Sequence, residues 1–204
     1  MGKTLVIFGL GNPGMEYADT RHNVGFMAIN ELAKKWGSGP FKQEKNICSW
    51  TSLQKKGTKV FLIKPLTFMN NSGNAVNWFK SYYKIPTENI LVIYDDVALD
   101  NANIRIRKQG ASGGHNGVEN IIEHIGKKFH RIRVGVKGDH EIFQLHKYVL
   151  ARFSVEEREA IDKSLEIFPE MVMTILSRGY DRAMNMYNNT KTKQVAPEGN
   201  KIES

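Results

Sequence analysis

The sequence Lys3-Thr4-Leu5-Val6-Ile7-Phe8-Gly9 is apolar nearly throughout. Such a run is typical of a strand that is buried within a parallel sheet. A loop rich in Gly and Pro follows, from Leu10 to about Arg21, and apolar residues then return with helical spacing. The stripe of this predicted helix consists of Gly25, Ala28, Ile29, Leu32 and Trp36, and Gly37-Ser38-Gly39-Pro40 ends it.

The alternation of strand and helix patterns continues along the chain. Further strands are predicted at 46–54 and 58–63, which Lys55-Lys56-Gly57 joins as a hairpin, and at 90–94, 104–107 and 131–136. Further helices have apolar stripes at Ala75, Val76, Phe79 and Tyr83, at Val118, Ile121, Ile122 and Ile125, and within a long region at 154–188 that Pro169 should kink or divide. We therefore predict an α/β fold of three layers, with a largely parallel or mixed twisted sheet and helices on both faces.

Length and composition predict one globular domain. The chain has 204 residues, 41% of them hydrophobic and 25% charged, which is the range of a soluble globular protein. We expect a single domain over residues 1–189 and a disordered tail over 190–204, which lacks aromatic residues and periodicity. Cys48 is the single cysteine, so no internal disulfide can form. No apolar run is long enough for a membrane helix, and the expected location is the cytoplasm.

The charge of the chain is basic and uneven. The net charge is +8, with 29 Lys and Arg against 21 Asp and Glu. Between Ile104 and Lys137 there are eight Lys and Arg and two Glu. A positive field of this kind attracts polyanions, among which nucleic acid is the leading candidate.

Polar residues that follow the predicted strands suggest a catalytic site. They are Asn12 and His22 after the first strand, Asn70 after the 58–63 strand, Asp95 at the end of the 90–94 strand, and His115 and Asn116 beyond the 104–107 strand. In α/β sheets, sites gather beyond the carboxyl ends of strands.

One histidine beside a carboxylate forms a general base, and Asp96 is the alternative acid. Asparagines can hold an amide backbone, orient water or stabilise an oxyanion. With no obvious nucleophile, the set suggests that water attacks an activated carbonyl. We expect no cofactor and no metal, because a lone His–Asp pair falls short of a stable zinc site.

Two short motifs point to other functions. The stretch Gly9-Leu10-Gly11-Asn12-Pro13-Gly14 satisfies GxGxxG. Dinucleotide binding requires a helix that starts inside this motif, but Pro13 and the residues after it have no helical pattern. Gly110-Ala111-Ser112-Gly113-Gly114 satisfies GxSxG, and Asp139 with His140 or His146 could complete a triad around Ser112. The basic, half-exposed strand before this motif argues against a serine hydrolase, which remains an alternative.

Five motifs together resemble those of the bacterial-type peptidyl-tRNA hydrolases. They occur in family order from residue 3 to about 188. The motifs are Gly9-Leu10-Gly11-Asn12-Pro13-Gly14 with Tyr17 and Thr20-Arg21-His22-Asn23-Val24-Gly25; Lys64-Pro65-Leu66-Thr67-Phe68-Met69-Asn70-Asn71-Ser72-Gly73; Tyr94-Asp95-Asp96; Gly113-Gly114-His115-Asn116-Gly117; and Arg131-Ile132-Arg133-Val134-Gly135-Val136.

The resemblance implies a monomeric α/β enzyme that cleaves the ester between a peptide and the 3′ ribose of tRNA and so recycles tRNA during translation. By matching position, His22 would be the general base, Asp95 its orienting partner, and Asn12 the residue that helps to distinguish a blocked from a free amino group. The substrate-binding residues would be Tyr17, Phe68, Met69, Asn70, His115 and Asn116, with Arg107 and Arg133 near tRNA phosphate. The alternative to an enzyme is an RNA-binding protein on the same scaffold.

Two segments depart from the family pattern. Residues 138–145 are more acidic and apolar than the basic loop that is usual there, and Gln109-Gly110-Ala111-Ser112 has fewer glycines than many relatives. Neither change affects the predicted catalytic residues.

Overall fold

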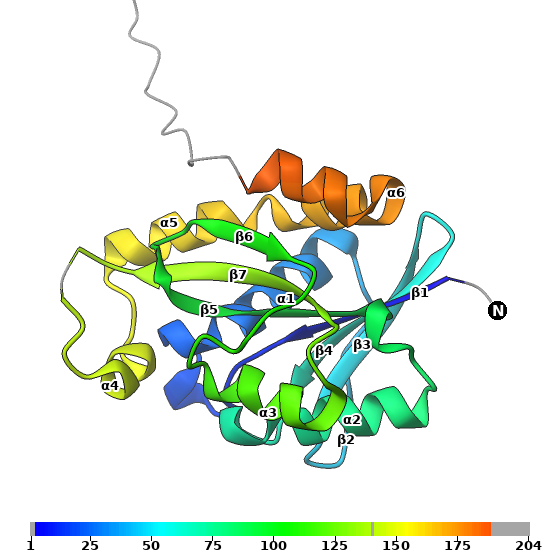
Figure 1. Cartoon of the computed structure of the whole chain (residues 1–204), viewed down its shortest axis with the longest axis horizontal. Coiled ribbons are helices and arrows are strands. Elements are labelled where there is room, and N and C mark those ends of the chain that lie inside the picture. Colours follow the sequence, from blue (N-terminus) through cyan, green and yellow to red (C-terminus); the bar gives the residue numbers. More distant parts are fainter. Residues whose placement is uncertain (1–2, 140, 189–204) are drawn as a thin grey trace, which may run out of the picture.

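The structure, a computed structural model, describes residues 3–139 and 141–188. Within these ranges, seven strands form one sheet in the order β2-β3-β4-β1-β5-β7-β6 (Figure 1). The strands are β1 (Thr4–Gly9), β2 (Lys42–Glu44), β3 (Cys48–Lys55), β4 (Thr58–Pro65), β5 (Ile90–Asp100), β6 (Ile104–Arg107) and β7 (His130–Lys137). β1 pairs in parallel with β4 and β5, and β5 pairs in parallel with β7. β2, β3 and β6 pair antiparallel with their neighbours, so the sheet is mixed as predicted.

Helices cover both faces of the sheet. One face carries α1 (Val24–Trp36), α5 (Val155–Leu165) and α6 (Phe168–Tyr187), and the other carries α2 (Ser72–Tyr82) and α3 (Asn116–Ile125) (Figure 1). The short helix α4 (Leu145–Leu150) lies at one end of the molecule (Figure 1). The predicted three-layer α/β class is confirmed.

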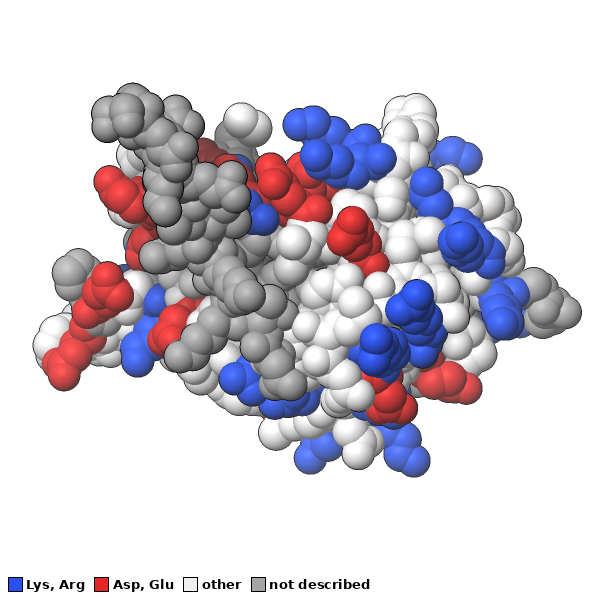
Figure 2. All heavy atoms as spheres, turned by 90° about the horizontal axis from the view of Figure 1, so that it is seen from above, with Lys and Arg blue, Asp and Glu red and all other residues white. Residues whose placement is uncertain are grey.

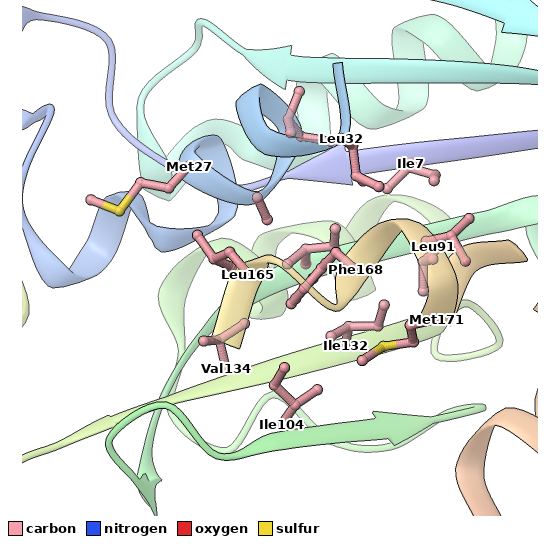
Figure 3. Packing of buried hydrophobic residues seen from close by; sticks show 14 of the residues in the cluster. Ile7, Met27, Leu32, Leu91, Ile104, Ile132, Val134, Leu165, Phe168 and Met171 are labelled. Atoms are coloured by element: carbon pink, nitrogen blue, oxygen red, sulfur yellow. The ribbon is translucent and has the colours of Figure 1, made fainter. Parts of the chain in front are cut away.

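Buried apolar side chains of the described residues form two clusters, one on each face of the sheet. In the first cluster, Phe168 and Met171 of α6 pack over Leu91 and Ile132 of the sheet (Figure 3). The second cluster joins α2 and α3 to the other face, where Phe79 packs edge-on against Phe8 at 6.0 Å between ring centroids. Burial of these side chains supplies the main driving force that holds helices and sheet together.

Two glycines allow α1 to pack directly on the end of β1. A Cβ atom on Gly9 would lie 2.1 Å from the Gly25 carbonyl oxygen, and a Cβ on Gly25 would lie 2.3 Å from the backbone nitrogen of Leu10. No side chain fits at either position, since real contacts of this kind begin above 3 Å. Gly9 of the GxGxxG motif therefore serves helix packing here, and α1 begins only at Val24, outside the motif.

The structure refines the predicted elements. β5 continues beyond Tyr94 to Asp100, with an irregular register between Asp96 and Asp100. The long C-terminal region is divided, as predicted, because α5 ends at Leu165 and Pro169 lies in the first turn of α6. The predicted tail over 190–204 lies outside the described residues. No helix in the described ranges has the length and apolarity to cross a membrane.

Candidate active site

Two histidines meet one buried carboxylate at the end of the sheet. Asp95 of β5 is 2% exposed, and its Oδ1 atom lies 2.9 Å from Nδ1 of His22 and 3.0 Å from Nε2 of His115. His22 belongs to a 3-10 turn, Arg21–Asn23, immediately before α1, and His115 is the N-cap residue of α3. The two imidazole rings lie 5.0 Å apart between centroids.

The hydrogen bonds set the tautomers of both histidines. A carboxylate only accepts hydrogen bonds, so His22 donates through Nδ1 and His115 donates through Nε2. Nε2 of His22 is then left without a proton, which makes it available as a base. The other nitrogen of His115, Nδ1, accepts the backbone N–H of Val118 at 3.3 Å and so caps α3.

Asp95 stays ionised in this environment. Burial by itself would raise the pKa of its carboxyl group, but His115 and His22 together hold that pKa well below its usual range. Asp96, the alternative acid, faces elsewhere: it accepts hydrogen bonds from the Arg133 side chain and from the backbone N–H of Ala98. The geometry therefore places Asp95, and not Asp96, beside His22.

Arg21 anchors the turn that carries His22. Its Nη2 donates to the Glu157 carboxylate at 2.6 Å, and its Nη1 donates to the Arg152 carbonyl at 3.0 Å. The guanidinium also lies over the Tyr148 ring, 4.2 Å from the centroid. These contacts fix the turn against α4 and α5, so His22 is presented from a well-held segment.

Asn12 joins the loop after β1 to the loop after β4. Its backbone N–H donates to Oδ1 of Asn23 at 2.9 Å, and its side-chain oxygen accepts the backbone N–H of Met69 at 2.8 Å. The side-chain oxygen of Asn12 is therefore already used. Among the described residues, its amide N–H₂ group has no acceptor.

Met69 packs the loop after β4 against the start of α3. Met69 is buried and lies beside Gly117 of α3, where a Cβ atom would come within 2.5 Å of its sulfur. Asn70 and Asn116, the neighbours of these two residues, are both exposed. Phe68 is 54% exposed and has φ 59°, a conformation that costs a non-glycine residue of order 1–3 kcal/mol and is often found at functional sites.

A cleft of about 520 Å³ opens beside the His22–Asp95–His115 group. Six of the predicted site residues line it: His22, Asp95, His115, Asn116, Arg107 and Arg133. The other five lie outside this cleft, on the loops after β1 and β4: Asn12, Tyr17, Phe68, Met69 and Asn70. The structure thus brings Asp95, the two histidines and the two arginines together in one cleft. Asn12 is connected to this group through its hydrogen bonds to Asn23 and Met69 on the neighbouring loops.

The cleft is also lined by residues that were not predicted to bind substrate, although Asp96 was named as the alternative acid and Ser112 and His146 as members of a possible triad. They are Tyr94, Asp96, Val97, Ala98, Arg131, Leu145, His146 and Val149, together with the glycine-rich loop over 109–114. The sequence did indicate the position of Arg131. Side chains two residues apart on a strand point to the same face of the sheet, so Arg131 shares a face with Arg133 of β7. For Leu145, His146 and Val149 the short helix α4 gave no recognisable pattern.

The GxSxG motif does not form a nucleophile elbow. Ser112 Oγ accepts the backbone N–H of Gly114 at 3.3 Å, and no histidine or carboxylate in the described residues contacts it. The motif follows β6, which is a four-residue strand at the edge of the sheet rather than its centre. The serine hydrolase alternative is therefore not supported.

The His22–Asp95–His115 group could also hold a metal ion, since the three ligand atoms lie within 4.8 Å of one another. In the described residues it is the one such group. Metal binding through Nδ1 of His22 would, however, leave the proton of that ring on Nε2, and His22 would no longer be a base. The hydrogen bonds to Asp95 account for the arrangement with ordinary proton chemistry.

Comparisons with known proteins agree with the motifs. The family model described as Peptidyl-tRNA hydrolase matches residues 6–195. The peptidyl-tRNA hydrolase of Caldanaerobacter subterraneus subsp. tengcongensis is 46% identical over 188 residues, covering 90% of this chain and 98% of the relative. That of Fervidobacterium nodosum is 42% identical over 184 residues, covering 90% and 96%.

Solved structures give the same result. A crystal structure of peptidyl-tRNA hydrolase from Acinetobacter baumannii has a TM-score of 0.85 with this chain at 34% identity, covering 91% of this chain and 95% of that one. A second peptidyl-tRNA hydrolase structure, a complex with N-propanol, has a TM-score of 0.87 and covers 93% and 96% at the same identity. The chain belongs to the peptidyl-tRNA hydrolase family.

Proposed function

We propose that this protein hydrolyses the ester bond between the peptide and the 3′ ribose of tRNA in peptidyl-tRNA, and so returns tRNA to translation. The observation that carries the proposal is the hydrogen bond between His22 and Asp95, which leaves Nε2 of His22 free to accept a proton. The substrate class is inferred from family membership, and the role of His22 as a general base is inferred from the geometry of the site.

In the proposed mechanism, water is the nucleophile. His22 Nε2 takes one proton from the water as its oxygen attacks the ester carbonyl, and the ionised Asp95 stabilises the imidazolium that forms. Collapse of the tetrahedral intermediate breaks the bond to the 3′ oxygen of the ribose, which takes the proton back from His22. The products are the free peptide acid and tRNA with a 3′ hydroxyl. A general base of this kind contributes roughly 10²–10⁴ in rate.

The asparagines are proposed to hold the peptidyl group. Asn70 and Asn116 are exposed and offer both donors and acceptors, which suits a peptide backbone of any sequence. Asn12 can offer only its amide N–H₂ group, because its oxygen is engaged by Met69. That group suits an acceptor, such as a carbonyl oxygen, better than a free ammonium group. Tyr17, Phe68 and Met69 are proposed as further contacts of the substrate on the same loops.

The tRNA is proposed to bind over β6 and β7, with Arg107 and Arg133 at its phosphates. The eight Lys and Arg between Ile104 and Lys137 lie on β6, on β7 and on the loops beside them, whereas α5 and α6 have four Lys and Arg against six Asp and Glu. Figure 2 shows the face on the α5 and α6 side, where positive and negative side chains are interspersed. Charge thus favours the cleft side for a polyanion.

The proposal extends to the state of the protein in the cell. We propose that residues 1–189 act as one domain, as a monomer, in the cytoplasm, where peptidyl-tRNA is released from translation. We propose that the reaction needs water, His22 and Asp95 and no cofactor.

The test is the release of the blocked amino acid from N-acetyl-aminoacyl-tRNA at low salt. The wild-type protein should release it, His22→Asn should be at least 100-fold slower with tRNA binding unchanged, and Ser112→Ala should match the wild type. Tight RNA binding by the wild type with no release would instead support the RNA-binding alternative. Loss of activity in Ser112→Ala with retention in His22→Asn would support a serine hydrolase.

A further inference from the structure

Arg131 is a buried charge without a counter-ion in the part of the chain that the structure describes. It lies on β7 at the floor of the cleft and is only 1% exposed. Burial lowers the pKa of its guanidinium, but an arginine keeps its charge in a protein. Within the described residues it forms no ion pair with a carboxylate, and its Nε and Nη2 atoms have no hydrogen-bond acceptor. Such a group is costly for stability, so its presence calls for another explanation.

The register of β6 and β7 makes the cost larger. Arg107 lies opposite Arg131, and Arg105 lies opposite Arg133. Like charges in directly opposed positions of a strand pair are destabilising. Of these four arginines, Arg133 alone has a carboxylate partner among the described residues, Asp96. Arg131 therefore differs from Arg133 in having neither a counter-ion nor access to solvent.

Arg131 interacts with the side chain of Tyr94 and contacts the glycine-rich loop. Its Nη1 donates to the carbonyl oxygen of Ala111 at 2.6 Å, and its guanidinium lies over the Phe129 ring at 4.3 Å from the centroid. Within the loop between β6 and α3, the backbone N–H groups of Gly114 and His115 donate to Ser112 of the same loop, each at the long distance of 3.3 Å. The Ala111 carbonyl is thus the point at which the sheet holds the loop.

The loop forms one wall of the cleft and ends at His115. Residues 109–114 all line the cleft, and His115 and Asn116 follow directly. His115 has its own attachments, to Asp95 and to the N–H of Val118. Within residues 3–139 and 141–188, Arg131 is the side chain that attaches the middle of this loop to the sheet.

We propose that Arg131 is a positioning residue that fixes the glycine-rich wall of the cleft for the 3′ end of the tRNA. The inference rests on the proposed function, because it assumes that the cleft takes this part of the substrate. In this proposal, the buried Arg131 does not contact phosphate. The partly exposed Arg107 is the residue that contacts phosphate. Loss of Arg131 should therefore weaken substrate binding in a way that salt does not change.

The experiment compares Arg131→Met, which keeps the length but removes the charge, with Arg131→Lys, which keeps the charge but loses the planar fork. KM and kcat are measured with N-acetyl-aminoacyl-tRNA at several salt concentrations, together with Tm. Arg131→Met should raise KM at least tenfold at every salt concentration, with kcat within threefold of wild type and Tm unchanged or higher. Arg131→Lys should raise KM by a smaller factor. Arg178→Met, on the exposed surface of α6, is the matched control and should keep the wild-type KM.

Three results would overturn the inference. A wild-type KM in Arg131→Met, with or without a lower Tm, would make Arg131 merely structural. A flatter dependence of KM on salt, like that of Arg107→Met, would mean direct contact with phosphate. If Arg131→Met does not fold, a wild-type KM in Arg131→Lys would reject the inference, and a raised KM at wild-type Tm would support it. Turnover by the wild type separates all of these from a failure of the proposed function itself.

Discussion

At the scale of single residues, the candidate site depends on the Asp95 carboxylate. Its Oδ1 atom accepts hydrogen bonds from both His22 and His115, so one buried anion fixes two imidazole tautomers. The tautomer of His22 determines whether Nε2 can act as a base. The tautomer of His115 determines whether Nδ1 can cap α3. Chemistry and local structure therefore depend on the same charge.

Asp95→Asn should remove most of the activity. An amide presents one acceptor and one donor, so it cannot accept from both histidines, and an amide N–H facing Nδ1 of His22 would move the imidazole proton to Nε2. We expect kcat to fall by roughly 10²–10⁴, with KM nearly unchanged, because Asp95 is buried beneath the two histidines. Steady-state kinetics with N-acetyl-aminoacyl-tRNA measure both parameters. A large rise in KM at constant kcat would contradict this role.

The sequence predicted the members of the site better than their contacts. His22 and Asp95 could be predicted to meet, because both follow strands whose carboxyl ends share one edge of the sheet. The contact of His115 with Asp95 could not, since it depends on how a loop of glycines folds back from β6. Arg131 could not be recognised as buried either, because a charged residue on a strand ordinarily faces solvent.

At the scale of elements, the join between β1 and α1 leaves no room for side chains. Gly25→Ala would place a Cβ atom 2.5 Å from the Ile93 carbonyl oxygen and 2.3 Å from the Leu10 nitrogen, both of which belong to the backbone. Backbone cannot move aside as a side chain can, so we expect a loss of about 3 kcal/mol or more in the free energy of unfolding. The turn that carries His22 should move as well, and kcat should fall.

The control for this substitution is Gly39→Ala, where no neighbouring atom of the described residues lies within 4 Å of the new Cβ. Urea unfolding of both variants measures the difference. Equal stability of Gly25→Ala and Gly39→Ala would show that the close packing of α1 on β1 is not required.

A second contact between elements should make stability depend on pH. His130 of β7 stacks on Tyr180 of α6 at 3.5 Å between ring centroids. Burial, assisted by the positive charge of Lys108, lowers the pKa of His130 to about 4, against roughly 6.5 in an unfolded chain. Below pH 6.5 the unfolded chain therefore binds a proton that the folded chain does not. Because of His130, the free energy of unfolding should fall as the pH falls from about 6.5 to about 4. Below about pH 4, the contribution of His130 should no longer change with pH.

The expected size of this effect is about 1–3 kcal/mol after allowance for partial solvent exposure. His130→Phe keeps the stacked ring but cannot bind a proton, so its stability should fall less between pH 7 and pH 4.5 than that of the wild type. Urea unfolding at several pH values measures the difference. A constant difference between the two proteins over this pH range would rule out His130 as its source.

The elements that the sequence did not predict are the ones with few side-chain signals. β2 has the sequence Lys42-Gln43-Glu44, which has no apolar residue, and it exists because its backbone pairs with β3. β5 runs past the apolar residues to Asp100 for the same reason, through its pairing with β7. Backbone hydrogen bonds leave no periodic pattern in the sequence, whereas the longer helices and buried strands do.

At the scale of the whole molecule, positive charge is concentrated around one edge of the sheet. The eight Lys and Arg between Ile104 and Lys137 lie on β6, on β7 and on the loops beside them, whereas α3 has two Glu and α5 has four Asp and Glu against two Lys and Arg. A polyanion is therefore attracted toward this edge of the sheet. The cleft with its two histidines opens on the attractive side, because Arg107 and Arg133 line it.

This distribution predicts how tRNA binding should respond to salt. Affinity for tRNA should fall linearly on a logarithmic plot against salt, since each phosphate that an exposed Lys or Arg neutralises releases counterions. If Arg107 contacts a phosphate as proposed, Arg107→Ala should reduce the slope by about 1, while Arg178→Ala, on the exposed surface of α6, should leave both slope and affinity unchanged. Filter binding of deacylated tRNA over a range of salt concentrations measures the slopes. Equal slopes in wild type and Arg107→Ala would place the phosphates elsewhere, and a shallower slope in Arg178→Ala would mean that tRNA binds over α6 and not over the cleft.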